Sequence, residues 1–157
     1  MKAQYIGDFD EWKIGFRFSV PVTVRFSETD MYGHLNNTVN FAYFEYARIE
    51  FLKHIGLMND WLSPDGQNIP VVADLQCDYL KQVFFDQSID IHVKAEKIGS
   101  SSVDLHYLAT DEKGEPLFTG RGTMVQISRR TGKGSPWTDG DREAFVAVPA
   151  AHQGEHR

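Results

Sequence analysis

The side chains best suited to chemistry in this sequence lie in one short polar segment, SETDMYGHLNN, at 27–37. A carboxylate, Asp30, precedes an imidazole, His34, by four residues, and an apolar stretch with helical spacing follows. A helix N-terminus has unpaired N–H groups and a partial positive charge, which suit a developing oxyanion. Gly33 lets the backbone pass close to a ligand. The segment therefore predicts attack on a carbonyl group, although it also fits a plain polar connection to a capped helix.

The apolar stretch at 38–56 is expected to form that helix. Asn37 or Thr38 is placed to cap its start, and Gly56 is placed to end it. Apolar side chains cover most of its circumference, which is typical of a buried helix.

Alternating apolar and polar residues predict strands on both sides of this helix. On the first strand, at 16–26, Phe16 to Phe26 form an apolar face, and Pro21 suggests an edge or a bulge. Four further strands are expected at 70–80, 88–98, 102–110 and 116–128, joined by turns into an antiparallel meander. A short helix is expected near Thr138 or Asp139, and the chain end, from 150, is expected to be frayed.

This order of elements predicts an α+β protein in which an antiparallel sheet wraps around one long helix. We expect a single domain over 1–157, with a core at about 15–130 and a C-terminal tail at 131–157. One main helix leaves the other face of the sheet short of cover. Dimerisation is therefore expected, by extension of the sheet or by packing around the helix ends.

Composition narrows the class of protein. The net charge of −6 disfavours nucleic acid as a partner, because phosphate binding needs a basic field. No apolar run is long enough to span a membrane, and the N-terminus lacks the pattern of a secretion signal. The lone cysteine, Cys77, excludes an intramolecular disulfide and favours a reducing compartment, so we expect a cytoplasmic protein.

Other chemical sites are weakly supported. Nucleotide-binding glycine loops, the GxSxG elbow and the HExxH motif are absent from the sequence. The six histidines are scattered; His92 and His106 could be neighbours across a strand pair, which we interpret as a structural pair, so no metal is expected. Cys77 is interpreted as a small buried hydrophobic residue rather than a nucleophile.

The stretch at 25–57 resembles the signature of the hotdog-fold acyl-CoA thioesterases, in particular the 4-hydroxybenzoyl-CoA thioesterase type. The matching elements are Thr29-Asp30, Gly33-His34, Asn36-Asn37 and Glu45-Tyr46-Ala47-Arg48. The strand–helix–four-strand order extends the resemblance over about 15–130. It implies the hotdog fold, an antiparallel β-sheet wrapped around one long central α-helix.

The resemblance also implies roles for individual residues. Asp30 matches the catalytic carboxylate, which acts as nucleophile or as general base for water, and the amide of Asn37 matches the group that polarises the thioester carbonyl. His34 is the second expected catalytic residue. It matches the histidine of a similar stretch, D-M-N-x-H-V-N-N, of plant acyl-carrier-protein thioesterases, in which the aspartate, asparagine and histidine are implicated in catalysis. Tyr32 stands here in place of that asparagine. Asn37, Thr38 and Glu45 are the expected substrate-binding positions. No cofactor is expected, because a thiol leaves readily and one carboxylate suffices.

Glu45 and Arg48 have two interpretations. Arg48 falls among apolar residues of the helix, where a lone charge is costly, and Glu45 is three residues earlier, so the two can form an ion pair. Alternatively, Glu45 faces the acyl pocket and tunes Asp30 by like-charge repulsion.

The expected partner is an acyl-CoA, and the protein is expected to be a homodimer or homotetramer. Basic residues should contact the CoA phosphates; the candidates are Lys94, Lys97, Arg121, Arg129, Arg130 and Lys133. Two alternatives to thioester hydrolysis stay open. One is a hotdog dehydratase or hydratase that uses Asp30 and His34 as an acid/base pair, and the other is a non-catalytic acyl-CoA binding module.

Overall fold

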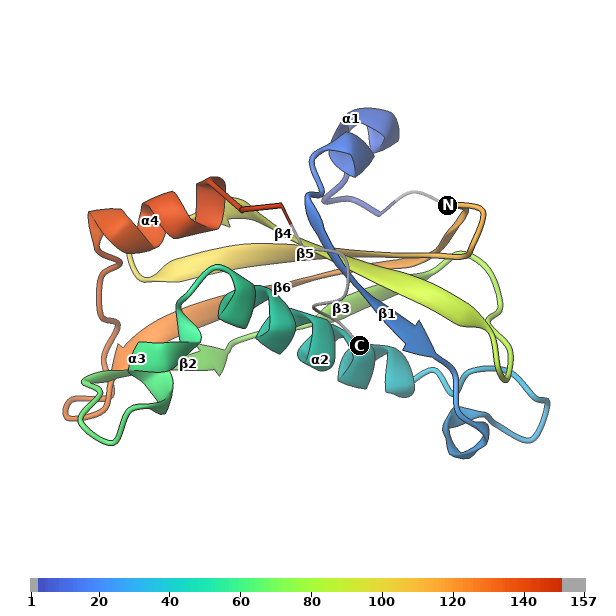
Figure 1. Cartoon of the computed structure of the whole chain (residues 1–157), viewed down its shortest axis with the longest axis horizontal. Coiled ribbons are helices and arrows are strands. Elements are labelled where there is room, and N and C mark those ends of the chain that lie inside the picture. The colour runs from blue at the N-terminus through green and yellow to red at the C-terminus, as the bar shows by residue number, and fades with distance from the viewer. Residues whose placement is uncertain (1–2, 151–157) are drawn as a thin grey trace.

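The computed structural model describes residues 3–150, in which the strands form one curled antiparallel sheet (Figure 1). The strands are β1 (Phe18–Thr23), β2 (Asn68–Val72), β3 (Gln76–Tyr79), β4 (Ser88–Ile98), β5 (Ser102–Thr110) and β6 (Pro116–Ser128). The helices are α1 (Phe9–Ile14), α2 (Val39–His54), α3 (Met58–Leu62) and α4 (Asp139–Val146), with a 3-10 turn, η1, at Phe26–Glu28. The spatial order is β1-β4-β5-β6-β2, and β3 pairs with β6 beside β2. The expected α+β class is confirmed.

Helix α2 lies along the concave face of the sheet, as expected (Figure 1). It starts after Thr38, and Gly56, with φ +86°, follows its end in the left-handed conformation that favours glycine. Phe44, Ala47 and Phe51 are fully buried in the main core, whereas Tyr46 on the opposite side is exposed. The helix is therefore buried on one face rather than all round.

Phe44 makes a close contact between α2 and the sheet. Its ring stacks on that of Tyr107 of β5, with 4.5 Å between ring centroids. On β6, Gly120 leaves room for the same ring, since a Cβ atom there would lie 2.5 Å from Phe44 carbons. The glycine thus sets how closely the helix approaches the sheet.

The outer face of the sheet is covered in part by α1, which the sequence analysis did not predict. Trp12 of this helix packs with Ile6 and with Leu108 of β5 in a second apolar cluster. The N-cap, Asp8, accepts a hydrogen bond from the Glu11 N–H and so fixes the start of this short helix. The expectation of an uncovered second face is wrong where α1 lies.

A buried histidine connects α1 to the sheet. Trp12 Nε1 donates to His106 Nδ1 at 2.8 Å, and His106 Nε2 lies 2.9 Å from Asp104 Oδ2. Both bonds are satisfied when the neutral ring carries its proton on Nε2. Burial lowers the pKa of His106 despite the opposing effect of Asp104. His106 is therefore a structural residue, and it faces Lys94, not His92, across the strand pair.

Two of the expected strands differ from the structure. The strand predicted at 16–26 is shorter, because Phe16 packs with the α1 cluster and Phe26 lies in η1 with 77% of its surface exposed. The strand predicted at 70–80 is split into β2 and β3. At the break, Asp74 Oδ1 accepts a hydrogen bond from the Thr123 N–H, so a side chain replaces the backbone ladder. β1 is an edge strand, which agrees with Pro21 within it.

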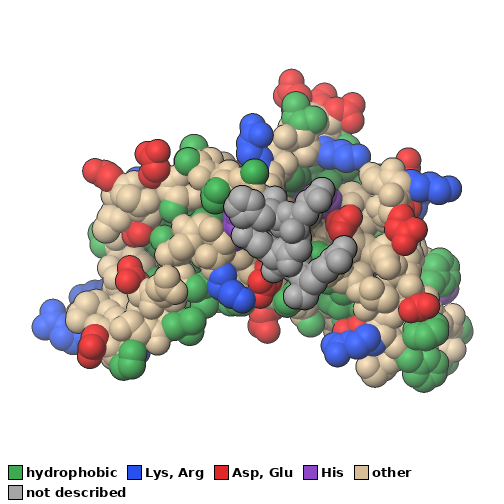
Figure 2. Space-filling view, viewed as in Figure 1, with side chains coloured by type: hydrophobic (Ala, Val, Ile, Leu, Met, Phe, Trp, Pro, Cys, Tyr) green, Lys and Arg blue, Asp and Glu red, His purple; other side chains and the backbone are tan. Residues whose placement is uncertain are grey.

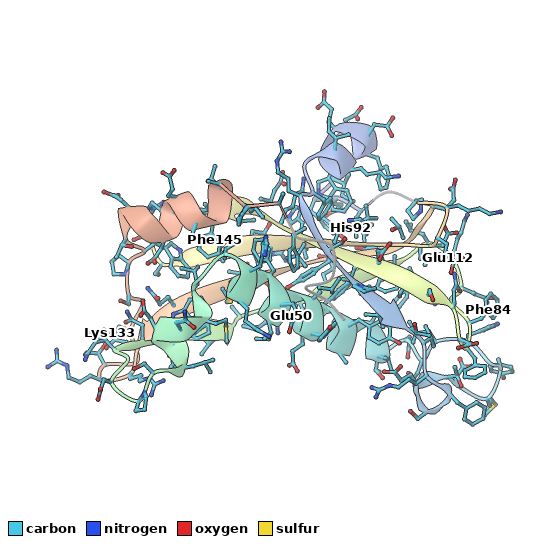
Figure 3. All side chains as sticks on the ribbon, viewed as in Figure 1. Glu50, Phe84, His92, Glu112, Lys133 and Phe145 are labelled. Atoms are coloured by element: carbon cyan, nitrogen blue, oxygen red, sulfur yellow. The ribbon has the colours of Figure 1, made fainter. Side chains whose placement is uncertain are left out.

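The segment that follows β6 packs on the same core. Helix α4 starts after Thr138, whose hydroxyl accepts from the Asp141 N–H, and this confirms the predicted short helix. Its Phe145 joins Trp137 in the core (Figure 3). The expected fraying of the chain end concerns mainly residues 151–157, which lie outside the described range. Within residues 3–150, no helix combines the length and apolar character needed to cross a membrane.

The contact between Phe44 and Gly120 predicts a specific cost of enlarging the glycine. Gly120→Ala should lower the free energy of unfolding by about 1–3 kcal/mol, because the added methyl group displaces a fully buried ring. Urea titration followed by circular dichroism measures this. Gly7→Ala is the matched control, since its Cβ meets nothing within 4 Å. An unchanged stability of Gly120→Ala would contradict the proposed close packing.

The lowered pKa of His106 predicts loss of stability in acid. The unfolded chain binds a proton near pH 6.5 and the folded chain only at lower pH, so the free energy of unfolding should fall as pH drops below about 6.5. His106→Gln keeps an acceptor for Trp12 but does not titrate. Urea titrations between pH 7.5 and 5 should therefore show a weaker pH dependence for this variant than for the wild type; equal slopes would refute the assignment.

Candidate active site

Asp30 lies in a tight turn that holds its carboxylate by the backbone. Asp30 Oδ1 accepts hydrogen bonds from the N–H groups of Tyr32, at 2.9 Å, and His34, at 3.1 Å. The Asp30 N–H donates to the His34 carbonyl, and Gly33, with φ +79°, allows the chain to reverse. One carboxylate oxygen is thus engaged, and no bond to a described residue is found for the other, Oδ2.

His34 is positioned by its backbone and by an aromatic neighbour. It forms an isolated β-bridge with Phe84, and its ring lies edge-on to that of Phe84 with 5.1 Å between centroids. The next residue, Leu35, donates its N–H to the Val83 carbonyl at 2.6 Å. Within the described residues, the His34 ring makes no hydrogen bond to Asp30; the two are joined only through the backbone.

Asn36 binds the backbone at the start of α2. Its side-chain Oδ1 accepts from the Thr38 N–H at 3.1 Å, and its carbonyl accepts from the Val39 N–H at 2.9 Å. Tyr79 of β3 donates its hydroxyl to the Asn37 carbonyl. Burial raises the pKa of Tyr79 to about 12, so this donor keeps its proton at neutral pH. In the range 3–150, no acceptor is found for the Asn37 N–H, which is free to bind a ligand.

Glu28 forms hydrogen bonds that connect the loop to α2. Its carboxylate accepts from the Arg25 N–H and from the Tyr43 hydroxyl of α2, both at 2.9 Å, and its carbonyl accepts from the Asn36 N–H. Burial disfavours the ionised form, but the hydrogen bonds from Arg25 and Tyr43 together outweigh it, so the pKa of Glu28 is lowered. Glu28 therefore links the loop to α2.

A groove of about 600 Å³ opens over this arrangement, within the usual size range of small-molecule sites. Apolar and polar groups share its wall, and it is lined by Asp30, His34, Leu35, Asn36, Asn37, Asn40, Tyr79, Leu80, Lys81, Gln82 and Val83. An apolar floor beside a carboxylate and a helix N-terminus suits an acyl group attached to a reactive carbonyl.

The structure brings together three of the five predicted site residues. Asp30, His34 and Asn37 line the groove; Thr38 follows Asn37 as the N-cap residue of α2 but does not line it. Glu45 is exposed on α2 and is not part of the groove wall.

The predicted ion pair of Glu45 with Arg48 is wrong, since no such pair forms within the described chain. Arg48 is buried and donates instead to the Tyr107 hydroxyl at 3.3 Å. The alternative, in which Glu45 faces the acyl pocket, is not supported by its exposed position.

The sequence analysis did not predict that Asn40 and the segment at 79–83, which includes Tyr79 and Lys81, would line the groove. Tyr79 ends β3 and Lys81 follows it, about 50 residues from Asp30 in the chain. The bridge between His34 and Phe84 and the hydrogen bond from Leu35 to Val83 bring this segment beside the loop. Asn40 is a polar residue at the start of a helix that is otherwise largely apolar. This contrast in the sequence could have identified it as a candidate site residue. Its side chain is 2% exposed, and its Oδ1 atom has no hydrogen-bond partner among the described residues.

The basic residues proposed for the CoA phosphates have other contacts or positions. Arg121 bridges Asp74 and Asp104, Lys94 binds the Trp12 carbonyl, and Arg129 donates to the Trp61 carbonyl. Figure 3 shows Lys133 at the end of the molecule opposite Phe84, and so far from the groove. Of the side chains that line the groove, Lys81 is the cation.

Other candidates for chemistry are not supported. Burial raises the pKa of the Cys77 thiol to about 12, so it is not a thiolate at neutral pH. Across residues 3–150, no three side chains of His, Cys, Asp or Glu lie close enough to hold a metal ion.

Exposed hydrophobic side chains surround the mouth of the groove. Figure 2 shows them gathered at the lower right, over the loops that lead into α2. They include Phe26, Met31, Tyr32, Phe84 and Phe85, of which Met31 is 89% exposed. A cluster of this kind beside a site marks a surface for a ligand or for another protein chain.

Comparisons with known proteins agree on one family. The model of the thioesterase-like superfamily matches residues 24–145. The uncharacterized protein YsmA of Bacillus subtilis strain 168 is 47% identical over 138 residues, which cover 88% of this chain and 91% of YsmA.

Solved structures of thioesterases are similar to this chain as well. A thioesterase of Thermus thermophilus, solved with coenzyme A and zinc, is 31% identical with a TM-score of 0.71, over 85% of this chain and 95% of that one. A DHNA-CoA thioesterase of Staphylococcus aureus shares the fold, with a TM-score of 0.70 at 23% identity over 83% and 89% of the two chains. The chain described here therefore has the hotdog fold and belongs to the thioesterase-like superfamily.

Proposed function

We propose that this protein hydrolyses acyl-CoA or aroyl-CoA thioesters to the free acid and CoA, with Asp30 as the essential carboxylate. The observation that carries the proposal is the placement of Asp30. Its carboxylate is oriented by two backbone N–H groups and lines a groove that ends at the N-terminus of α2. The family supports thioester hydrolysis in general, and the geometry supports these residues.

The reaction needs few groups. A carboxylate with a reference pKa of about 3.9 is ionised at neutral pH and serves as nucleophile or as general base for water. The thioester oxygen, which gains negative charge during the attack, is stabilised by the Asn37 N–H and the dipole of α2. The thiolate of CoA leaves without an acid, since the pKa of a thiol is about 8.5. No cofactor enters this scheme.

The remaining site residues are assigned to binding. His34, which contacts Phe84, is proposed to hold the substrate beside Asp30. Thr38 is the N-cap residue of α2, next to Asn37. Glu45 is exposed and does not line the groove, so it is not assigned a role in substrate binding within one chain. Hydration of an enoyl thioester, the main alternative, needs an acid and a base as a pair. The lack of a hydrogen bond between the His34 ring and Asp30, within the described residues, favours hydrolysis.

Lys81 is proposed to contact a phosphate of CoA at the groove mouth. Its only described ion pair, with Glu115 at 4.0 Å, joins two exposed side chains and is weak. The CoA complex of the Thermus thermophilus relative supports this class of ligand.

A homodimer or homotetramer is proposed from the exposed sheet edge. β2 and β3 pair only with β6 in the described chain, and Val71, Val72, Tyr79 and Leu80 along them are exposed. A second copy that extends the sheet at this edge would cover them.

Asp30→Asn tests the reaction. Asparagine keeps an acceptor for the Tyr32 and His34 N–H groups but cannot act as base or nucleophile, so kcat should fall at least about 10²-fold. Free-thiol release from short, long and aromatic acyl-CoAs measures this, and a thermal melt checks the fold. Asp65→Asn, remote from the groove, is the control.

Two results of that assay would overturn the proposal. If the wild type binds acyl-CoA and returns it intact, the protein is a binding module. If it adds water to an enoyl-CoA without releasing thiol, it is a hydratase.

Lys81→Glu tests the CoA contact. Reversal of this charge should raise KM for acyl-CoA about 2- to 5-fold with kcat unchanged, because an exposed charge contributes modestly to binding. The effect should shrink in high salt, where charges are screened. Lys133→Glu at the opposite end controls for net charge. Equal effects of the two variants would show that Lys81 makes no specific contact.

A further inference from the structure

The turn before α2 presents one backbone donor that the described chain does not use. The Asn36 carbonyl accepts from the Val39 N–H at 2.9 Å, and Asn36 Oδ1 accepts from the Thr38 N–H at 3.1 Å. These two bonds close a turn in which Asn37 is the second residue. For the Asn37 N–H itself, no acceptor is found within residues 3–150. This N–H is the group proposed above to stabilise the thioester oxygen.

A bond from outside the turn holds Asn37. Tyr79, the last residue of β3, donates its hydroxyl to the Asn37 carbonyl from 42 residues away in the chain. Tyr79 is paired with Phe118 of β6, whose side chain is 1% exposed. The two bonds within the turn fix its shape, whereas the bond from Tyr79 fixes its position relative to the sheet.

Two other described links join the loop to the segment that follows β3. Leu35 donates its N–H to the Val83 carbonyl, and His34 forms a β-bridge with Phe84. Both links are made before the turn begins. Loss of the Tyr79 hydroxyl would therefore leave the turn without a direct hydrogen bond to the sheet.

The Tyr79 hydroxyl acts through Asn37 rather than on the substrate. A tyrosine has one hydrogen to donate, and here it is given to the Asn37 carbonyl. Burial raises the pKa of Tyr79 to about 12, so the hydroxyl keeps this hydrogen throughout the neutral range. The bond is therefore in place before a substrate binds.

We infer that Tyr79 is a positioning residue, which holds Asn37 so that its N–H meets the thioester oxygen as negative charge develops there; this rests on the proposed thioester hydrolysis. Donors that are fixed in advance need not be reoriented during the reaction, and a small misplacement of a reacting group slows it. Tyr79 gives up no proton and forms no bond to the substrate. Its hydroxyl determines where a neighbouring donor lies.

Tyr79→Phe tests this role, since it keeps the ring and removes the hydroxyl. The variant should lower kcat about 10-fold with KM unchanged, because a donor aimed at the developing charge matters more in the transition state than in the bound substrate. Free-thiol release from the acyl-CoA that the wild type hydrolyses fastest measures both constants.

The second readout is the infrared carbonyl band of a bound acyl-CoA that carries ¹³C at the thioester carbon. The measurement is made in Asp30→Asn, in which slow hydrolysis leaves the bound thioester intact. A hydrogen bond to the carbonyl oxygen weakens the C=O bond and lowers its stretching frequency. The band should therefore lie at a higher frequency when Tyr79→Phe is added. A purely structural role of Tyr79 would leave the band in place.

Tyr5→Phe is the matched control. The Tyr5 hydroxyl donates to Thr119 Oγ1 at 2.9 Å, and neither residue lines the groove. This variant loses a hydrogen bond of the same kind, so it should lower the thermal unfolding midpoint as Tyr79→Phe does. It should leave kcat and the carbonyl band unchanged.

Several outcomes would overturn the inference. These are a wild-type kcat in Tyr79→Phe, a raised KM with unchanged kcat, an unmoved carbonyl band, or a changed mass by light scattering, which would assign the loss to assembly at the sheet edge. In each case the wild type still releases thiol, so thioester hydrolysis stands. Failure of the wild type to release thiol would instead overturn the proposed function.

Discussion

The packing of Phe44 into the space above Gly120 determines where α2 lies, and the site depends on where α2 lies. The ring is held between Tyr107 on one strand and a glycine on the next, so the helix approaches the sheet at a fixed height. Because the helix N-terminus supplies part of the groove wall, this height also sets the distance between Asn37 and the strand that carries Tyr79. A contact deep in the core thereby controls the shape of a site at the surface.

The loop before the helix is held in one arrangement by hydrogen bonds. Backbone N–H groups orient Asp30, Asn36 accepts from the N–H of Thr38 at the start of α2, and Glu28 binds the Tyr43 hydroxyl. The bonds to Asp30 come from the backbone, and its second carboxylate oxygen, Oδ2, has no partner among the described residues. In the proposed reaction, Asp30 is therefore held in place before the substrate binds, so little ordering of this carboxylate is left for the reaction itself.

The sequence predicted the elements with strong periodicity and the loop with unusual chemistry. The bounds of α2, three of the sheet strands and the cap at Thr138 agree closely with the structure, because each depends on local spacing. Helix α1 was missed because it has six residues, too few to be stable alone, and depends on the bond from Trp12 to His106. The predicted partner of Arg48, Glu45, was wrong because the actual partner, Tyr107, is 59 residues away in the chain and is brought near only by folding. The environment of Asn40 follows only from the folded chain.

Helix α1 also limits how copies of this protein can pack together. The middle of an uncovered sheet is a flat apolar surface on which a second sheet can lie. Here Trp12 and Ile6 already occupy that surface over Leu108. This N-terminal segment therefore covers a part of the sheet on which a neighbouring molecule would otherwise pack. A relative without this segment would present the surface, and the two proteins could share a site yet build different assemblies from it.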